Sequence, residues 1–396
     1  MPKKITKASK AVVAKVRRAF GDPVSAPKPN QRFIPIPPTF KKPSDLVFPL
    51  SNVVPSSVIT KIKQAGKIVF HTVGDTGGIN GGEIQTAIAD QMEKQVAAAA
   101  DSDKPAFFYH LGDVIYYNGI STDYGAQFYE PYQYYPSPIL AVPGNHDCDN
   151  HPGKNDPPDL EPSMTGFMQN FCDSTPSMSS QSSYRKTMNQ PWAYWTLDAP
   201  LVTIIGLFSN VDGSLDKHGD STQYNWLVDQ LKKADPNKCL LITLHHPSFS
   251  LDMPHGGYPM ILSTLDKAFK AAKRMPDAVF SGHVHNYQRF TRTVGKKQIP
   301  YVIAGAGGYA HQLRAMHRLQ HDPKTNDAIV VPFQTAHKDV ILSEYNQDAP
   351  GFLRITIDGQ FLFGEYFVNS FDTMTPPANS YDVFKLDWKN GSLVAV

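Results

Sequence analysis

The sequence predicts an α/β fold. From residue 66 onward, short runs rich in β-branched and aromatic residues alternate with stretches of helix-forming residues, which is the pattern of α/β proteins. Near the C-terminal end, Asp358-Gly359 separates two such runs, and Asp-Gly is a strong signal for a tight β-hairpin. At 396 residues the chain is long enough to bury a large core.

The expected elements follow from composition and periodicity along the chain. Runs rich in Val, Ile, Leu, Phe and Tyr are predicted as strands at 67–73, 106–111, 139–142, 192–197, 201–208, 240–244, 278–280, 299–304, 352–357 and 361–367. Stretches rich in strong helix formers are predicted as helices at 83–100, 223–234 and 260–275. Residues 150–183 are rich in turn-forming residues, so we expect a long loop or a small lid there.

The two ends of the chain differ from this α/β segment, which we place at residues 66–370. Residues 1–20 contain seven Lys and Arg residues and no acid, and a Pro-rich stretch follows. Because proline fixes φ and removes a backbone donor, we expect residues 1–65 to form an extended arm. The basic segment could contact an acidic surface, although a solvated tail is the simpler interpretation. Residues 371–396 are assigned to a C-terminal extension.

Charge and composition exclude several classes of protein. The formal net charge of the whole chain is +2 and that of residues 1–20 is +7, so the remaining residues have a mildly acidic net charge of −5. This argues against nucleic-acid binding by the main domain, which would need clustered Lys and Arg. We find neither an apolar run of the roughly 18–20 residues that span a membrane nor a secretory signal. We therefore expect a cytoplasmic protein with reduced Cys148, Cys172 and Cys239, although Cys148 and Cys172 could pair across a loop.

Polar side chains follow five of the predicted strands directly. The five strand ends read Gly74-Asp75-Thr76-Gly77, Gly112-Asp113-Val114-Ile115-Tyr116, Gly144-Asn145-His146-Asp147, His245-His246-Pro247 and Ser281-Gly282-His283-Val284-His285. Each motif alone is weak, because a Gly-Asp after a strand is often a simple turn. In open α/β sheets, however, ligands bind beyond the carboxyl ends of the strands. Together these oxygen and imidazole donors predict a site for iron, manganese or zinc.

The number of donors suits a pair of metal ions. A two-metal site needs about seven protein ligands besides bridging and terminal oxygens. The strand ends supply seven side chains, namely Asp75, Asp113, Tyr116, Asn145, His245, His283 and His285. His146 is left beside Asn145, a position that suits a general acid.

These motifs, in this order, resemble those of the calcineurin-like metallophosphoesterase superfamily and, within it, the purple acid phosphatases. The motifs GDxG, GDxxY, GNH followed by an acid, HxP and GHxH are all matched. The resemblance covers residues 66–370 and implies a four-layer α/β/β/α sandwich of two mixed sheets. It also implies an acid-phosphatase-like enzyme, in which a metal-bound hydroxide hydrolyses a small phosphate-ester substrate.

The resemblance implies a role for each residue of the motifs. One metal ion would be held by Asp75, Asp113, Tyr116 and His285, and the other by Asp113 as a bridge, Asn145, His245 and His283. His146 matches the histidine that contacts the substrate and its leaving group, and His255 resembles a second phosphate-contacting histidine. His246 would face the ligand histidines or the substrate. Asp147 could orient His146 or could instead cap the next turn.

Tyr116 indicates which metals to expect. Most members of the superfamily have Asp-x-His at the first motif, where this chain has Gly77, and Tyr116 can replace that lost donor. A phenol with a pKa of about 10 binds well only as phenolate, which favours a trivalent ion. Two carboxylates, a phenolate and a hydroxide have a total charge of about −4. Fe(III) together with divalent iron, manganese or zinc has a charge of about +5, so the centre would keep about one positive charge to attract a phosphate anion. Ordinary packing in a Tyr-rich loop is the alternative interpretation of Tyr116.

Four other functions are compatible with parts of the sequence or of the fold. A phosphodiesterase or nucleotidase could use the same centre. A non-catalytic scaffold of the same fold would be expected to have lost ligands, and all seven are present. The glycines at 77, 78, 81 and 82 suggest a phosphate-binding loop, but the Gly-Lys-Ser/Thr element is missing. The chain also lacks the Gly-x-Ser-x-Gly elbow of serine hydrolases.

Overall fold

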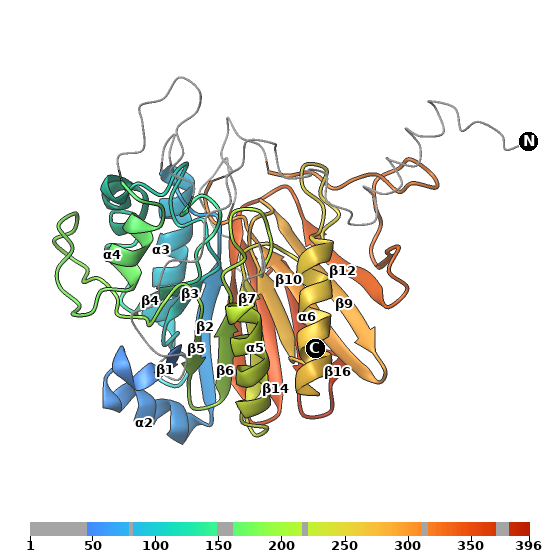
Figure 1. Cartoon of the computed structure of the whole chain (residues 1–396), viewed down its shortest axis with the longest axis horizontal. Helices are drawn as coiled ribbons and strands as arrows, with labels where there is room; N and C mark the ends of the chain where they lie inside the picture. Colours follow the sequence, from blue (N-terminus) through green and yellow to red (C-terminus); the bar gives the residue numbers. More distant parts are fainter. Residues whose placement is uncertain (1–45, 79–81, 149–160, 216–220, 310–315, 370–379) are drawn as a thin grey trace, which may run out of the picture.

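Two mixed β-sheets pack face to face, and helices cover their outer faces (Figure 1). This computed structural model describes residues 46–78, 82–148, 161–215, 221–309, 316–369 and 380–396. The predicted four-layer α/β/β/α sandwich is confirmed.

The larger sheet has nine strands with a parallel centre. Its order is β1 (Val47–Pro49), β5 (Trp195–Asp198), β6 (Val202–Gly206), β7 (Cys239–Leu244), β8 (Ala278–Ser281), β10 (Lys297–Ala304), β9 (Tyr287–Val294), β12 (Val340–Asn346) and β11 (Phe333–Gln334). Strands β6, β7, β8 and β10 run parallel, so their carboxyl ends meet at one edge. Every residue of β7 is buried, as expected for a parallel strand that is covered on both faces.

The smaller sheet has seven strands. Its order is β16 (Ser392–Val394), β15 (Asp382–Asp387), β14 (Phe361–Val368), β13 (Gly351–Asp358), β2 (Lys67–Val73), β3 (Phe108–His110) and β4 (Ile139–Ala141). Strands β2, β3 and β4 are parallel. Strands β13 and β14 form the antiparallel hairpin that Asp358-Gly359 predicts. The C-terminal extension thus adds β15 and β16 to the sheet.

The alternating side chains of β2 separate two regions of the core. Ile68 and Phe70 point into the layer between the sheets, where they join Leu241 and Phe280. Val73 lies in the other hydrophobic cluster, with apolar residues of α3 (Glu83–Ala98). On the opposite outer face, α5 (Thr222–Lys233) and α6 (Pro259–Ala272) lie over the nine-stranded sheet (Figure 1). Short helices η3 (Ser121–Asp123), η4 (Gly125–Tyr129) and α4 (Thr165–Phe171) lie in the connections.

The described structure differs from the sequence analysis at residues 46–65. We expected this segment to belong to an extended arm, but it forms β1, η2 (Leu50–Asn52) and α2 (Ser56–Ala65), and β1 pairs with β5. Its prolines are compatible with this fold. Pro49 ends an edge strand, and Pro55 directly precedes the first residue of α2, where proline is tolerated. Residues 1–45 of the predicted arm lie outside the described residues.

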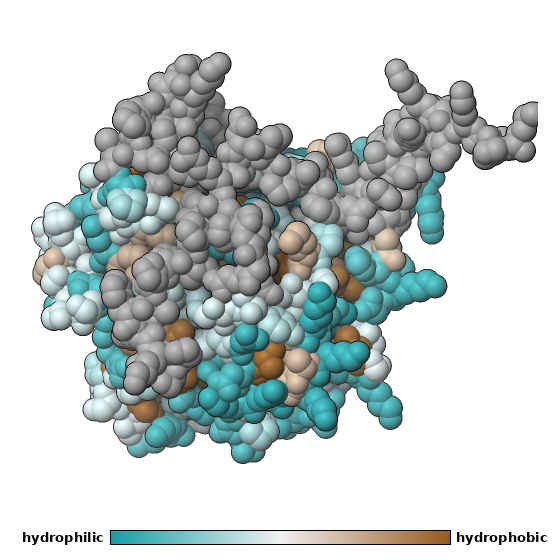
Figure 2. All heavy atoms as spheres, in the orientation of Figure 1, coloured by the Kyte–Doolittle hydropathy of each residue, from teal (hydrophilic) through white to brown (hydrophobic). Residues whose placement is uncertain are grey.

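The surface of the described residues is mainly hydrophilic in the view of Figure 2, with small, separate hydrophobic areas. Among the helices that the structure describes, none combines the length and the apolarity that a membrane-spanning helix needs. The predicted loop at 150–183 is described only from residue 161 onward, and this part contains α4.

Asp382 of β15 connects the two sheets. Arg289 of β9 donates hydrogen bonds of 2.6 and 2.9 Å to its carboxylate, and the Tyr287 hydroxyl donates a third of 2.6 Å. The Arg289 and Asp382 side chains are only 12% and 6% exposed. Asp382→Ala should therefore lower the free energy of unfolding of the metal-free protein by about 3–5 kcal/mol, because it leaves a buried guanidinium unpaired.

Urea unfolding measures this effect. Asp348→Ala is the matched control, because the Arg318–Asp348 pair is exposed and should contribute little to the free energy of unfolding. If both variants shift the unfolding midpoint equally, the Arg289–Asp382 pair does not contribute more to the free energy of unfolding than an exposed ion pair does.

Candidate metal centre

The carboxyl ends of β2, β3 and β4 in one sheet lie against those of β7 and β8 in the other. The backbone N–H of His283, after β8, donates a 2.7 Å hydrogen bond to Asp75 Oδ2, after β2. Asp113 Oδ2, after β3, lies 3.2 Å from His245 Nε2, after β7. All seven predicted ligands are at most 9% exposed. The structure therefore brings together the strand ends that the sequence singles out.

Four of the seven predicted ligands form the first group. Asn145 Oδ1 lies 3.1 Å from His245 Nε2 and 3.0 Å from His283 Nδ1. The two ring nitrogens are 3.3 Å apart, and Asp113 Oδ2 completes the group. Asp113, His245 and His283 offer ligand atoms close enough to share one metal ion.

Hydrogen bonding shows that this group fits a cation. The carbonyl of Leu111 can only accept, so the hydrogen bond of 2.9 Å between it and His245 Nδ1 places a hydrogen on Nδ1. In a neutral ring, the lone pair of His245 Nε2 then points toward the oxygens of Asn145 and Asp113. Atoms that can only accept are brought together when a proton or a metal ion lies between them. Burial disfavours the proton, yet the carboxylates of Asp113 and Asp75 raise the pKa of His245 to about 9.

The second group consists of Asp75, Tyr116 and His285. The Tyr116 hydroxyl lies 3.2 Å from Asp75 Oδ1 and 3.3 Å from His285 Nε2, and the last two atoms are 3.4 Å apart. Ligand atoms about 2.0–2.2 Å from one ion are separated by roughly 3.0–3.5 Å, so this triangle has the right size for one ion. Burial lowers the pKa of His285 to about 3, which keeps the imidazole in the neutral form that binds metals.

The buried acids also indicate a need for positive charge. Burial raises the pKa of Asp75 to about 8, with His245 opposing the shift and Asp113 adding to it. Burial likewise raises the pKa of the Tyr116 phenol well above its ordinary value, and both carboxylates add to that shift. A bound cation would reverse these shifts, because it favours the ionised form of each ligand.

The backbone at the site is held in uncommon conformations. Asp75, Asp113 and His283 have φ values of +59°, +52° and +69°, in the left-handed region. A left-handed conformation of a residue other than glycine lowers the stability by on the order of 1–3 kcal/mol, and such conformations cluster at functional sites. Gly144 allows a close approach, since a Cβ atom there would overlap the Asp113 carboxylate. The strand ends are thus shaped to present these side chains to one another.

The backbone and the Nδ1 atom of His146 are both held by hydrogen bonds. Its backbone N–H donates to Asp113 Oδ1 at 2.8 Å, and its Nδ1 lies 2.6 Å from the carbonyl oxygen of Tyr117. Because a carbonyl only accepts, Nδ1 carries a hydrogen, which leaves Nε2 for other contacts. The imidazole ring lies 4.6 Å from the Tyr116 ring. His146 therefore lies beside the second group of ligands.

Asp147 has a different role from the predicted orientation of His146. Its carboxylate accepts hydrogen bonds from the backbone N–H groups of Val114, Ile115 and Gly144 at 3.0, 3.3 and 2.8 Å. Asp147 thus joins the loops after β3 and β4 through backbone groups that precede it in the chain, which neither predicted role describes. The carbonyl of Tyr117 orients the His146 ring instead.

His255 lies beside the predicted ligands, with its ring 4.5 Å from that of His283. Buried Asp252 holds it, since Asp252 Oδ2 lies 3.2 Å from His255 Nδ1. His317 stacks on His285 with ring centroids 4.2 Å apart and lies 3.6 Å from the same carboxylate oxygen. The sequence motifs do not predict Asp252 and His317 as site residues, because neither follows a predicted strand. An Asp three residues before His255 was the available signal.

Three further residues surround the ligands. The His246 ring lies 4.3 Å from the His283 ring, as expected of a residue facing the ligand histidines. The Tyr258 hydroxyl lies 2.7 Å from His283 Nε2, and Tyr309 stacks on Tyr116 at 3.8 Å. Neither tyrosine belongs to a motif that predicts the site from the sequence.

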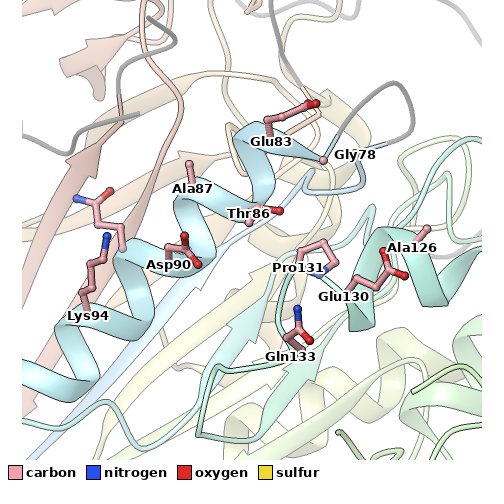
Figure 3. Close-up of a pocket in the computed structure, with 12 residues that line it drawn as sticks. Gly78, Glu83, Thr86, Ala87, Asp90, Lys94, Ala126, Glu130, Pro131 and Gln133 are labelled. Carbon is pink, nitrogen blue, oxygen red and sulfur yellow. The ribbon is translucent and has the colours of Figure 1, made fainter. Parts of the chain in front are cut away.

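A groove of about 620 Å³ lies elsewhere, between α3 and residues 126–133. Figure 3 shows Glu83, Asp90 and Lys94 of α3 on one side of it and Glu130 on the other. None of the described residues that line it is a predicted site residue. We therefore place the candidate functional site at the strand ends, where the predicted ligands converge.

The family model described as calcineurin-like phosphoesterase matches residues 68–287, which include β2 to β8 and all seven predicted ligands. The chain belongs to the calcineurin-like phosphoesterase family. Within this family it resembles the purple acid phosphatases. It is 33% identical over 115 residues to purple acid phosphatase 21 of Arabidopsis thaliana. That alignment covers 27% of this chain and only 25% of the relative, so the chain spans about a quarter of that relative's length.

Solved structures of this calcineurin-like phosphoesterase fold agree with the architecture. A purple acid phosphatase from yellow lupin (Lupinus luteus) seeds matches with a TM-score of 0.55 and 17% identity, over 81% of this chain and 54% of that chain. GAP50, the anchor in the inner membrane complex of Plasmodium, matches with a TM-score of 0.51 and 13% identity, over 81% of this chain and 89% of that chain. At these identities the similarity concerns the fold.

Proposed function

We propose that this calcineurin-like phosphoesterase is a binuclear, acid-phosphatase-like phosphomonoesterase that hydrolyses small phosphate esters. The observation that carries the proposal is the convergence of seven buried donor side chains from five strand ends. Their oxygen and imidazole chemistry suits iron, manganese or zinc. The similarity to purple acid phosphatases supports the same activity.

We assign the ligands according to the two groups. An Fe(III) ion would be held by Asp75, Asp113, Tyr116 and His285, and a divalent ion by Asp113, Asn145, His245 and His283. The phenol of Tyr116 favours placing the trivalent ion at the second group of ligands, to which Tyr116 belongs. When bound, the ions would stabilise the charge on the phosphoryl group and activate a water molecule.

The histidines around the ligands would handle the substrate. With a hydrogen on both ring nitrogens, His146 would give its Nε2 proton to the leaving oxygen and keep the Nδ1 hydrogen that bonds to the Tyr117 carbonyl. Asp252 holds His255 through Nδ1 in the same way, so that the protonated ring would donate from Nε2 to a phosphoryl oxygen. The protein holds both rings in place before the substrate binds, which favours proton transfer from His146 and phosphate binding by His255.

Metal content, visible colour and phosphatase activity test the proposal together. Purified protein loaded with iron and zinc should contain about two ions per chain, show a phenolate-to-iron(III) absorption band and hydrolyse an aryl phosphate monoester. A chelator should remove the ions and the activity. Tyr116→Phe should abolish the band, because it removes the phenolate.

Tyr134→Phe is the matched control, since the Tyr134 side chain is on the surface and should leave the band unchanged. A coloured Tyr116→Phe protein would refute the ligation of iron by Tyr116. Faster hydrolysis of an aryl diester than of the monoester would favour the phosphodiesterase alternative.

A further inference from the structure

Tyr309 is held against the candidate metal centre by its backbone. It follows β10 in the sequence Gly305-Ala306-Gly307-Gly308-Tyr309, and its N–H donates a 3.0 Å hydrogen bond to the carbonyl of Asp75. Gly308 has a φ of +144°, a conformation that side chains rarely allow, and a Cβ there would lie 2.7 Å from Gln85. The loop after β10 is thus packed closely on the loop after β2.

The Tyr309 side chain contacts two of the proposed iron ligands. Its ring stacks on the Tyr116 ring, with centroids 3.8 Å apart and planes 20° apart. It also meets the His285 ring edge-on, with centroids 4.6 Å apart. The Tyr309 side chain is buried, at 7% relative exposure of the residue. One residue therefore contacts Asp75, Tyr116 and His285, the three members of the second ligand group.

We propose that Tyr309 is a positioning residue that fixes the Tyr116 phenol toward the iron ion. This inference rests on the proposed function. A tyrosine ring can turn about two side-chain bonds, and each turn moves the phenol oxygen relative to its neighbours. Tyr309 packs against the face of the Tyr116 ring, while His146 packs nearby at 4.6 Å. These contacts restrict both bonds and hold the hydroxyl 3.2 Å from Asp75 Oδ1.

The test compares Tyr309→Leu with Tyr309→Phe in the full-length protein loaded with iron. Leucine removes the aromatic face, whereas phenylalanine keeps it. Tyr309→Leu should shift or weaken the visible band and lower the affinity for iron roughly 2- to 12-fold, the range expected for one aromatic pair. Tyr309→Phe should keep both the band and the affinity. Tyr309→Met repeats the test with an unbranched side chain if the leucine variant does not fold.

The outcomes separate this inference from the proposed function. A Tyr309→Leu protein with the wild-type band and iron affinity would overturn the positioning role alone. A Tyr309→Phe protein that loses the band would also overturn it, because the aromatic face would then not be the cause. If iron-loaded wild-type protein has no band, the phenolate site and the positioning role both fail.

A purely structural role for Tyr309 would have a different signature. It would lower the thermal stability of the metal-free leucine variant and leave the band of the folded, iron-loaded fraction unchanged. Measuring the band per bound iron excludes the contribution of unfolded protein. A band that is unchanged per iron would therefore overturn the inference even where stability falls.

Discussion

Asp113→Asn should lower kcat/KM for a phosphate monoester by more than about 10³-fold and should remove metal binding. Asp113 is the residue that we assign to both ions. Its Oδ2 lies 3.2 Å from His245 Nε2, and its Oδ1 accepts the backbone N–H of His146. Asparagine keeps the shape but replaces one oxygen by an NH₂ group, which donates and cannot bind a cation.

The same substitution should also destabilise the metal-free protein. Burial alone would raise the pKa of Asp113, but the charge of His245, whose Nε2 lies 3.2 Å from Asp113 Oδ2, holds that pKa below its ordinary value. Replacing the ionised carboxylate by a neutral amide therefore leaves the charge of buried His245 without this partner. Metal-free Asp113→Asn should unfold at a lower urea concentration than metal-free wild type, and added metal should stabilise only the wild type.

Asp101→Asn is the control for this experiment, because Asp101 forms surface ion pairs with Lys61 and Lys104. It should keep both activity and metal content. A purely structural role for Asp113 predicts a different pattern, in which metal-free Asp113→Asn is destabilised but its folded fraction still binds two ions. Isothermal titration with zinc and urea unfolding of the metal-free proteins distinguish the two roles.

The strand ends could be predicted from sequence because each places its chemistry directly after a buried apolar run. Runs such as Lys67–Val73 and Cys239–Leu244 are strands in the structure, and the polar residues after them meet at one edge. Parallel strands put their carboxyl ends together, so local motifs far apart in the chain become neighbours. The placement of Asp75, Asp113 and His245 therefore followed from the fold class. Metal binding by these residues stays a prediction.

The residues that surround the ligands could not be found in this way. Tyr258 precedes α6, Tyr309 lies in a glycine-rich loop and His317 lies between two strands, so none follows a motif with a recognised spacing. Their proximity to the ligands depends on how loops pack, which a single sequence does not encode as a local pattern. Asp147 shows a related difficulty, because a carboxylate beside a histidine can bind either the ring or the backbone.

The N-terminal part of the fold was missed for a different reason. A run of prolines predicts an extended arm, yet Pro49 and Pro55 occupy positions where a missing N–H has no cost. β1 has only three residues and depends on pairing with β5. Short edge strands of this kind are stabilised by tertiary contacts, which outweigh local propensity.

His146→Ala should lower kcat by about 10²–10⁴-fold while leaving the metal content intact. The metal ligands should survive because the contact of His146 with Asp113 is made by the backbone N–H, which alanine keeps. The lost function is that of the ring, whose Nδ1 is held by the Tyr117 carbonyl and whose Nε2 is left for the substrate. This variant therefore separates proton transfer from metal binding.

The leaving group of the substrate tests whether His146 donates a proton. An aryl phosphate releases a stable phenolate that needs little protonation, whereas an alkyl phosphate releases a strongly basic alkoxide. His146→Ala should therefore slow an alkyl phosphate more than an aryl phosphate, and His321→Ala, on the exposed surface, should slow neither. Equal losses for both substrates would make His146 a phosphate-binding residue and not an acid, and unchanged turnover would remove it from catalysis.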